Sequence, residues 1–256
     1  MRKLCLLLAV LVLLCGCKKE EKGQPLSELV GPPHTSTSNI QVIDADAPPV
    51  VEETPEATPE QEPEVPETQE SELPLVDLSS WELVLANAAH SIETYAPQTA
   101  EVEGMPVDHR IVEPLTAFLQ AARDQGLSVY LSSAYRDYDN QAYLFNRKLE
   151  QYGGDKAAAA AIVAPPGTSE HQTGLACDIT DQYYELKTHD LENTALYQWM
   201  SKHCQEYGFI VRYPKDKEDV TGIIYEPWHF RYVGVAAATY IMEHGLTLEE
   251  FHDLYT

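Results

Sequence analysis

The chain has 256 residues, and its 41 acidic and 17 basic side chains give it a formal net charge of -24. This length suffices for one sizeable domain with additional segments, or for two small domains. The negative charge argues against a nucleic-acid partner, because phosphate groups would be repelled. Three of the five cysteines lie within the first 17 residues, a clustering typical of a targeting segment rather than a disulfide framework.

The N-terminus resembles the export signal of a bacterial lipoprotein. Arg2 and Lys3 precede an apolar run over residues 4–14, which is too short to span a bilayer as a mature helix. The run ends in Leu14-Cys15-Gly16-Cys17, and a small residue directly before a cysteine is similar to the bacterial lipobox. Residues 1–16 are therefore predicted to be a signal peptide, and Cys17 is expected to carry the lipid that anchors the protein to the membrane. A cleaved signal with a free secreted product is the alternative.

Residues 17–75 are predicted to form a disordered, acidic, proline-rich tether. From Lys18 to Leu75 there are 14 Asp and Glu against 3 Lys, together with 10 of the 17 prolines and no aromatic residue. Such a composition cannot bury enough apolar surface to offset the entropy of the chain. Like charges and prolines also extend the segment, so it is expected to lift the following domain off the membrane.

Residues 76–256 are predicted to form one α+β domain, with a small, mainly antiparallel sheet and flanking helices. Apolar periodicity and Gly or Pro stops predict helices over 107–125, 139–152, 156–163, 193–207 and 236–244. Short apolar runs predict strands over 127–131, 174–179, 209–213 and 228–233. Residues 81–85 fit either a helix or a strand, since periodicity does not decide between them.

Two pairs of residues suggest metal chemistry. His171 and Asp178 lie seven residues apart across Gly174, and Glu226 lies three residues before His229 at a predicted strand start. Two histidines and one aspartate form a three-ligand set of the kind that catalytic zinc uses, with one position left for water. Glu226 would then be free to act as a base on that water. Each pair alone is a weak signal, because a single histidine is more often a packed or surface residue.

Three sequence motifs that occur together in one order are a more specific signal than either pair. Ser133-Ala134-Tyr135-Arg136, then the pattern Ser169-x-His171-x-x-Gly174-x-Ala176-x-Asp178, then Glu226-x-Trp228-His229-x-Arg231 resemble the VanY/VanX-type D,D-carboxypeptidases and dipeptidases, the M15 zinc peptidases. The resemblance spans most of residues 80–235 and implies the hedgehog/D,D-peptidase-like fold. It implies one Zn²⁺ per domain, bound by His171, Asp178 and His229.

The resemblance also implies roles for residues around the metal. Glu226 would be the general base and then the proton donor to the leaving amine, and Arg136 would stabilise the developing oxyanion or hold the scissile region. Ser133, Gln141 and Ser169 lie beside the matched strings and are candidate substrate contacts. Arg231 could orient a ligand or form a structural ion pair. Specificity loops are expected near residues 183–192 or 214–223.

The expected function is removal of the terminal D-alanine from peptidoglycan stem peptides by a lipid-anchored, monomeric enzyme in the bacterial cell envelope. Removal of D-alanine after a diamino acid and endopeptidase cleavage remain open within the same family. A second class of function is a non-catalytic wall-binding module in which zinc only stabilises the fold. The presence of Arg136 and Glu226 counts against this class, because a structural zinc needs neither residue. In an exported protein Cys177 and Cys204 are expected to form a disulfide, and two buried free thiols are the alternative.

Overall fold

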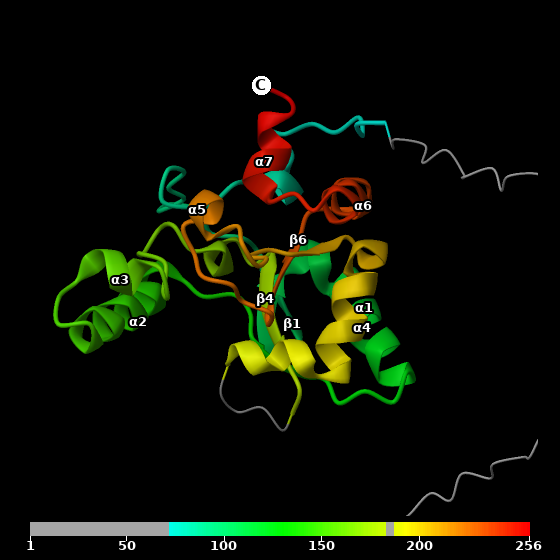
Figure 1. The fold of residues 1–256 in the computed structure, drawn as a ribbon, viewed down its shortest axis with the longest axis horizontal. Helices are drawn as coiled ribbons and strands as arrows, with labels where there is room; N and C mark the ends of the chain where they lie inside the picture. The colour runs from blue at the N-terminus through cyan, green and yellow to red at the C-terminus, as the bar shows by residue number, and fades with distance from the viewer. Residues whose placement is uncertain (1–71, 183–186) are drawn as a thin grey trace, which may run out of the picture. The chain divides into compact units, whose positions relative to one another are not determined.

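A four-stranded antiparallel sheet lies at the centre of the computed structural model, which describes residues 72–182 and 187–256 (Figure 1). The strand order is β3-β4-β6-β5, and a separate hairpin is formed by β1 and β2. The strands are β1 Thr99–Val102, β2 Met105–Asp108, β3 Tyr130–Ser133, β4 Ala176–Thr180, β5 Phe209–Val211 and β6 His229–Tyr232. The predicted α+β class with a small antiparallel sheet is confirmed. The predicted signal peptide, Cys17 and the tether up to residue 71 lie outside the described residues.

Helices flank the sheet on more than one side. In Figure 1, α2 and α3 lie together on one side of the central strands, α1 and α4 lie on the other, and α6 and α7 lie near the C-terminus. The bounds are α1 Val112–Asp124, α2 Tyr138–Gln151, α3 Lys156–Ala160, α4 Ala195–His203, α5 Glu218–Thr221, α6 Val235–His244 and α7 Leu248–Asp253. Five short 3-10 helices join them: η1 Trp81–Leu83, η2 His109–Ile111, η3 Glu170–Thr173, η4 His189–Asn193 and η5 Cys204–Tyr207.

Two apolar clusters hold these elements together. Helix α1 buries Leu115, Phe118, Leu119 and Ala122, which recur at helical spacing and form one stripe against the sheet. Phe118 stacks on Phe209 of β5 with ring centroids 5.3 Å apart. The second cluster joins β5 to α6 and α7 and is formed by Leu83, Ile210, Val233, Ala237, Ala238, Ile241, Leu248 and Phe251. The first cluster therefore packs α1 and α4 on the sheet, and the second packs α6 and α7 on β5.

The sequence prediction was wrong at several places. Strand β1 and helix α5 were not predicted, the strand expected over 127–131 is β3 at Tyr130–Ser133, and the helix expected over 156–163 ends at Ala160. Residues 107 and 108, assigned to a helix, belong to β2, because Glu103 and Gly104 adopt positive φ and close a β1–β2 hairpin. Residues 81–83 form a 3-10 helix rather than an α-helix or a strand. Helix α7 was not predicted, although Thr247 and Glu250 form a capping box at its start.

Both cysteines of the domain are free and buried. Cys177 lies on β4 and Cys204 begins η5, and each side chain packs in the main apolar cluster. The prediction of a disulfide between Cys177 and Cys204 is therefore wrong. Cys177 faces the core while its neighbour Asp178 faces the opposite side, as the alternation of a strand requires.

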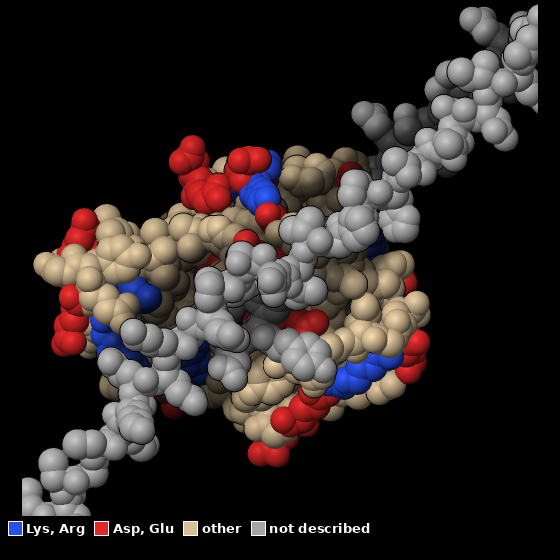
Figure 2. All heavy atoms as spheres, turned by 60° about the horizontal axis from the view of Figure 1, so that its bottom comes forward, with Lys and Arg blue, Asp and Glu red and all other residues tan. Residues whose placement is uncertain are grey.

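The described surface carries much of the negative charge of the chain. Figure 2 shows Asp and Glu side chains spread over the face that it presents, with Lys and Arg between them. Within residues 72–182 and 187–256, no helix has the length and apolar character needed to cross a membrane.

Candidate metal centre

A tight turn brings His171 and Asp178 to the same side of the sheet. All four residues of η3 are buried, and Gly174 ends this helix with φ +71°. A Cβ at Gly174 would lie 2.7 Å from the backbone nitrogen of Asp108, so only glycine fits between η3 and β2. After this glycine the chain enters β4, where Asp178 is 3% exposed and faces His171. The turn and the strand together set the separation between these two side chains.

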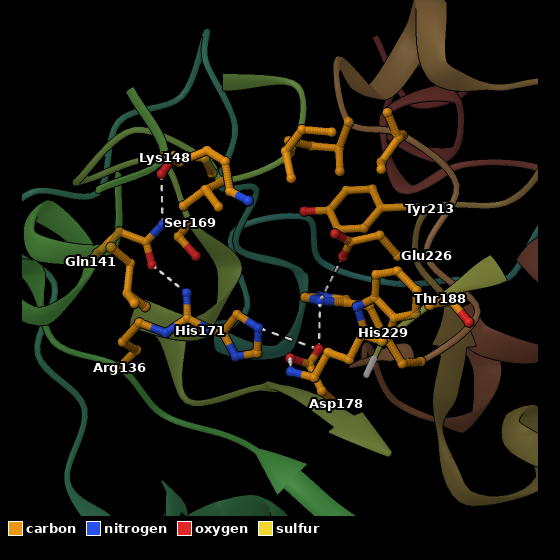
Figure 3. A pocket seen from close by; sticks show the side chains of 18 of the residues that line it. Arg136, Gln141, Lys148, Ser169, His171, Asp178, Thr188, Tyr213, Glu226 and His229 are labelled. Carbon is orange, nitrogen blue, oxygen red and sulfur yellow. Dashed lines mark hydrogen bonds and ion pairs between the residues drawn. The ribbon is translucent and has the colours of Figure 1, made fainter. Parts of the chain in front are cut away.

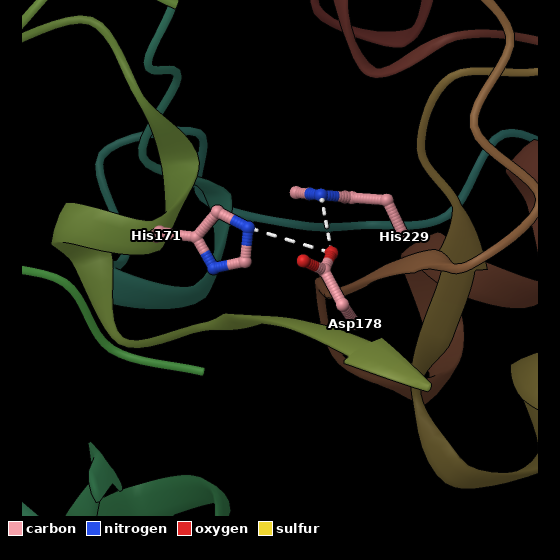
Figure 4. A group of neighbouring side chains, drawn as sticks. All are labelled: His171, Asp178 and His229. Carbon is pink, nitrogen blue, oxygen red and sulfur yellow. Dashed lines mark ion pairs between the residues drawn. The ribbon is translucent and has the colours of Figure 1, made fainter. Parts of the chain in front are cut away.

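His229 completes the cluster from the neighbouring strand. In the antiparallel pairing of β4 and β6, His229 is the direct partner of Asp178. The Asp178 Oδ1 atom lies 3.4 Å from His171 Nε2 and 3.2 Å from His229 Nδ1 (Figure 4). One ligand atom from each of the three residues lies within 4.8 Å of the others, and all three residues are buried. Three distant positions in the sequence therefore converge on one point.

The donor set fits a zinc ion. The Nδ1 atom of His171 lies 2.7 Å from the carbonyl oxygen of Ala134, which leaves Nε2 free to bind a metal. Asp178 Oδ1 is buried and, apart from its ion-pair contacts with His171 and His229, makes no hydrogen bond within the described residues, as expected of an atom that awaits a cation. Two imidazole nitrogens and one carboxylate oxygen are the ligands of many catalytic zinc sites. The cluster therefore meets the requirements for one Zn²⁺.

The buried surroundings shift the pKa values of the two histidines in opposite directions. Burial lowers the pKa of His171 to about 4. Burial alone would also lower the pKa of His229, but hydrogen bonding to Asp178 and Glu170 raises it to about 9. Asp178 keeps its pKa well below the ordinary value, because His171 and Lys187 outweigh the effect of its burial. The carboxylates of Asp178 and Glu170 thus favour positive charge at His229.

Glu226 and Arg136 border the same pocket, which has a volume of about 720 Å³ (Figure 3). Glu226 Oε2 lies 3.5 Å from His229 Nδ1, and burial raises the pKa of this carboxyl to about 7. A carboxyl group poised near neutrality can accept and return a proton. The backbone nitrogen of Arg136 donates to the carbonyl oxygen of His171 at 3.1 Å, so β3 and η3 position this arginine together.

The three candidate substrate contacts, Ser133, Gln141 and Ser169, differ in what their side chains contact. Gln141 is 1% exposed; its Oε1 accepts from Arg136 Nη1 at 2.7 Å, and its Nε2 donates to the carbonyl oxygen of Ala164 at 2.6 Å. Ser133 accepts from Arg136 Nη2 at 3.3 Å and reaches the site through that side chain. Ser169 is 4% exposed and lines the pocket beside the metal cluster. Gln141 and Ser133 therefore hold Arg136 in place.

Sequence reasoning missed two residues that contact the ligands. Lys187 Nζ lies 2.5 Å from Asp178 Oδ2, and Glu170 Oε2 lies 3.4 Å from His229 Nε2. Glu170 stands inside the matched string between Ser169 and His171, but nothing local in the sequence indicates its contact with His229. Lys187 lies in one of the two expected specificity loops, and His189 and Asp190 of that loop also line the pocket.

Comparison with known proteins identifies the family. Residues 104–235, just over half of the chain, match the family model described as VanY: D-alanyl-D-alanine carboxypeptidase. A D-alanyl-D-alanine carboxypeptidase of Enterococcus faecalis (strain ATCC 700802 / V583) is 39% identical over 186 residues, which cover 68% of this chain and 67% of that protein.

Two solved structures are similar in fold as well as sequence. A mutant of the vancomycin resistance D,D-pentapeptidase VanY in complex with Zn(II) is 37% identical, with a TM-score of 0.61 over 68% of this chain and 99% of that chain. VanYB in complex with D-alanine-D-alanine is 36% identical, with a TM-score of 0.62 over 69% of this chain and 100% of that chain. From the matched family model and these relatives, the chain belongs to the VanY family of zinc-dependent D-alanyl-D-alanine carboxypeptidases.

Proposed function

We propose that this protein removes the terminal D-alanine from peptidoglycan stem peptides on the outer side of a bacterial membrane, to which a lipid on Cys17 anchors it. The observation that carries the enzymatic part is the convergence of His171, Asp178 and His229 beside Glu226 in one pocket. A zinc ion held by these three residues would supply Lewis acidity, which lowers the pKa of water and polarises a peptide carbonyl.

Glu226 is placed to move the proton of the reaction. Its carboxyl is buried and faces the same point as the ligand atoms of Asp178 and His229. Glu226 takes a proton from the attacking water and returns it to the amine of the departing D-alanine, so one water is consumed for each bond broken. A pKa raised by burial suits both steps, because the group must bind the proton and then release it.

Arg136 is placed to offset the negative charge that develops on the carbonyl oxygen. Its guanidinium is held on one side by Ser133 and Gln141, which fixes its direction before substrate arrives. A preorganised cation of this kind stabilises the transition state without reorganising during the reaction. Arginine suits the position because it stays charged when it is buried.

Peptide digestion followed by mass spectrometry tests this function. The purified protein with zinc is incubated with a pentapeptide that ends in D-Ala-D-Ala, and separately with a tetrapeptide that ends in a diamino acid followed by D-Ala. Loss of one alanine from the pentapeptide, abolished by a chelator and restored by zinc, is the expected result. Loss of alanine only from the tetrapeptide would assign the other carboxypeptidase specificity. The absence of any product, with zinc bound, would favour a wall-binding module.

The anchor is supported by sequence alone, through the basic start, the apolar run and the Gly16-Cys17 pair. We expect the mature protein to partition with membranes and to incorporate a labelled fatty acid at Cys17. The Cys17→Ala variant should lose the label. Labelling of this variant at the same level would place the lipid elsewhere. We further expect a monomer, which sedimentation of the soluble domain would test.

A further inference from the structure

A buried carboxylate that belongs to none of the assigned roles lies behind His229. Glu170 is 1% exposed, and its Oε1 accepts from Arg212 Nε at 2.6 Å and from Arg231 Nη1 at 2.7 Å. Its other oxygen, Oε2, lies 3.4 Å from Nε2 of His229, and neither of these two buried atoms has another hydrogen-bond partner within the described residues. Glu170 therefore divides its two oxygens between a pair of arginines and a metal-site histidine.

The arginines that hold Glu170 are themselves fixed from distant parts of the chain. Arg212 Nη1 and Nη2 donate to both carboxylate oxygens of Glu249 on α7, at 2.8 and 2.6 Å. Arg231 Nη2 donates to the backbone carbonyl oxygens of Glu82 and Val84, at 2.9 and 2.8 Å. Both guanidiniums are fully buried, so their positions are determined by these bonds. Glu170 is thus held rigidly with one oxygen aimed at the imidazole.

Ion pairing with Arg212 and Arg231 alone does not explain why the second oxygen of Glu170 faces His229. Burying charged groups costs desolvation free energy, and a buried ion pair is weak evidence of net stabilisation. The observed geometry has a further consequence, because a neutral imidazole carries a proton on one nitrogen and a lone pair on the other. A carboxylate at Nε2 keeps the proton on that nitrogen, so the nitrogen left to offer its lone pair to a metal is Nδ1, which faces Asp178 and the metal centre.

We propose that Glu170 is a positioning residue, which accepts the Nε2 proton of His229 and so presents Nδ1 to the metal. Arg212 and Arg231 hold Glu170 in the orientation that this requires. The inference rests on the metal site of the proposed function, and it adds a residue that touches neither metal nor substrate. It also accounts for Arg231, whose role the sequence left open between orienting a ligand and forming an ion pair.

The Glu170→Gln variant tests the proposal sharply. Both arginines donate to the same oxygen, so the amide oxygen of the new side chain must face them and its NH₂ group must face His229. An NH₂ donor favours the wrong tautomer, with the lone pair on Nε2. We expect the dissociation constant for zinc, measured by competition with a chromophoric chelator, to rise about 10- to 100-fold.

Glu249→Gln is the matched control. It removes one negative charge from the same arginine network, but Glu249 bonds to Arg212 and Asn87 and does not touch His229. Each variant is compared after its folding is verified by circular dichroism and urea unfolding. Zinc affinity within about threefold of the wild type is expected for Glu249→Gln. Equal losses in both variants, or unchanged affinity in folded Glu170→Gln, would overturn the proposal.

A measurement on the unaltered protein decides the matter if Glu170→Gln does not fold. Histidine labelled with NMR-active nitrogen, and cadmium in place of zinc, reveal which imidazole nitrogen binds the metal. We expect scalar coupling from cadmium to Nδ1 of His229 and a retained proton on Nε2. Coupling to Nε2 would refute the assigned role of Glu170. Failure of the wild-type protein to bind any metal would instead refute the proposed function itself.

Discussion

Asp178 and His229 are direct partners in the antiparallel pairing of β4 and β6, and the Oδ1 and Nδ1 atoms of their side chains lie 3.2 Å apart. Two of the three metal donors therefore come from adjacent backbone positions on paired strands in the middle of the sheet. Such a pair is held by ladder hydrogen bonds and cannot separate without disrupting the sheet. The third donor, His171, is fixed by Ala134 and by the turn that ends at Gly174. A site built this way needs little rearrangement to bind a metal.

Replacing Glu226 by glutamine should stop turnover while zinc stays bound. Glu226 is not one of the three converging donors, and its carboxyl is the group placed to move the proton. Loss of a general base lowers kcat on the order of 10²- to 10⁴-fold. Steady-state kinetics and metal analysis of the same preparation measure both quantities. His171→Ala serves as the contrasting variant, because it should lose the metal as well. Near-normal turnover in Glu226→Gln would show that the proton moves through another group.

Removing the bonds that hold Arg136 should reduce kcat less than changing Arg136 itself. We expect Arg136→Lys to lose the directed guanidinium and lower kcat on the order of 10²- to 10³-fold. Gln141→Leu keeps the charge but frees Arg136 Nη1, so its effect should be smaller and lie mainly in kcat. Gln120→Leu, at an exposed position on α1, is the matched control and should have no effect. An unchanged kcat in Arg136→Lys would remove this residue from the mechanism.

The metal ligands could be predicted from sequence because short motifs that are weak alone occur together in an order that resembles a known family. His171 and Asp178 lie on two sides of one turn, and Glu226 and His229 lie three residues apart, so each half of the site is encoded within ten residues. Only their order in the chain links the halves. Glu170 could not be assigned a role in this way, since Arg212 and Glu249 lie far from it in sequence. Such long-range contacts appear only when the fold is known.

The sequence prediction of secondary structure also failed where tertiary contacts outweigh local signals. Val107 lies four residues before Ile111 and so extends the apolar pattern of α1 backwards, and the turn at Glu103 and Gly104 lacks the Asn-Gly or Asp-Gly pair that most strongly indicates a hairpin. Helix α7 has only six residues, so it offers little periodicity to detect, and its stability comes from burying Leu248 and Phe251. Tertiary packing decided both segments.

Gly174→Ala should destabilise the domain more than Gly126→Ala. Both glycines have positive φ, +71° and +76°, so each substitution incurs the cost of a left-handed residue, about 1 kcal/mol. At Gly126 the added Cβ meets nothing within 4 Å, whereas at Gly174 it would lie 2.7 Å from the backbone of Asp108. We expect a further loss of about 1–3 kcal/mol in the free energy of unfolding for Gly174→Ala. Equal urea midpoints for the two variants would contradict this packing argument.

The two thiols of the domain should react with a thiol reagent only after unfolding. Burial raises the pKa of Cys177 well above its ordinary value and that of Cys204 to about 12, so neither forms a thiolate near neutral pH. The sample is a fragment of residues 72–256, which lacks the three N-terminal cysteines. We expect two thiols per molecule to react in denaturant, and prior reduction should not change this number. Two thiols that appear only after reduction would instead demonstrate the disulfide.

Asp108 should contribute to stability in a manner that depends on pH. Its side chain is fully buried, and burial alone would raise its pKa. Hydrogen bonds from the side chain and backbone of Arg110 outweigh that effect and hold the pKa below its ordinary value of 3.8. Because the folded state favours the ionised form, the stabilisation is fully present above pH 3.8 and is lost as the pH falls through the lower folded-state value.

The Asp108→Asn variant tests this pH dependence of stability. Near pH 7 it should unfold about 1–3 kcal/mol more easily than the wild type, since Arg110 loses a charged acceptor. The difference should remain constant down to pH 4 and then shrink, because the wild-type carboxyl becomes protonated while the amide does not titrate. Glu103→Gln, at the exposed ion pair with Arg123, controls for the loss of one surface charge and should have a much smaller effect. A gap between wild type and Asp108→Asn that stays equally wide at pH 2.5 would mean that shape, and not charge, determines the contribution of Asp108.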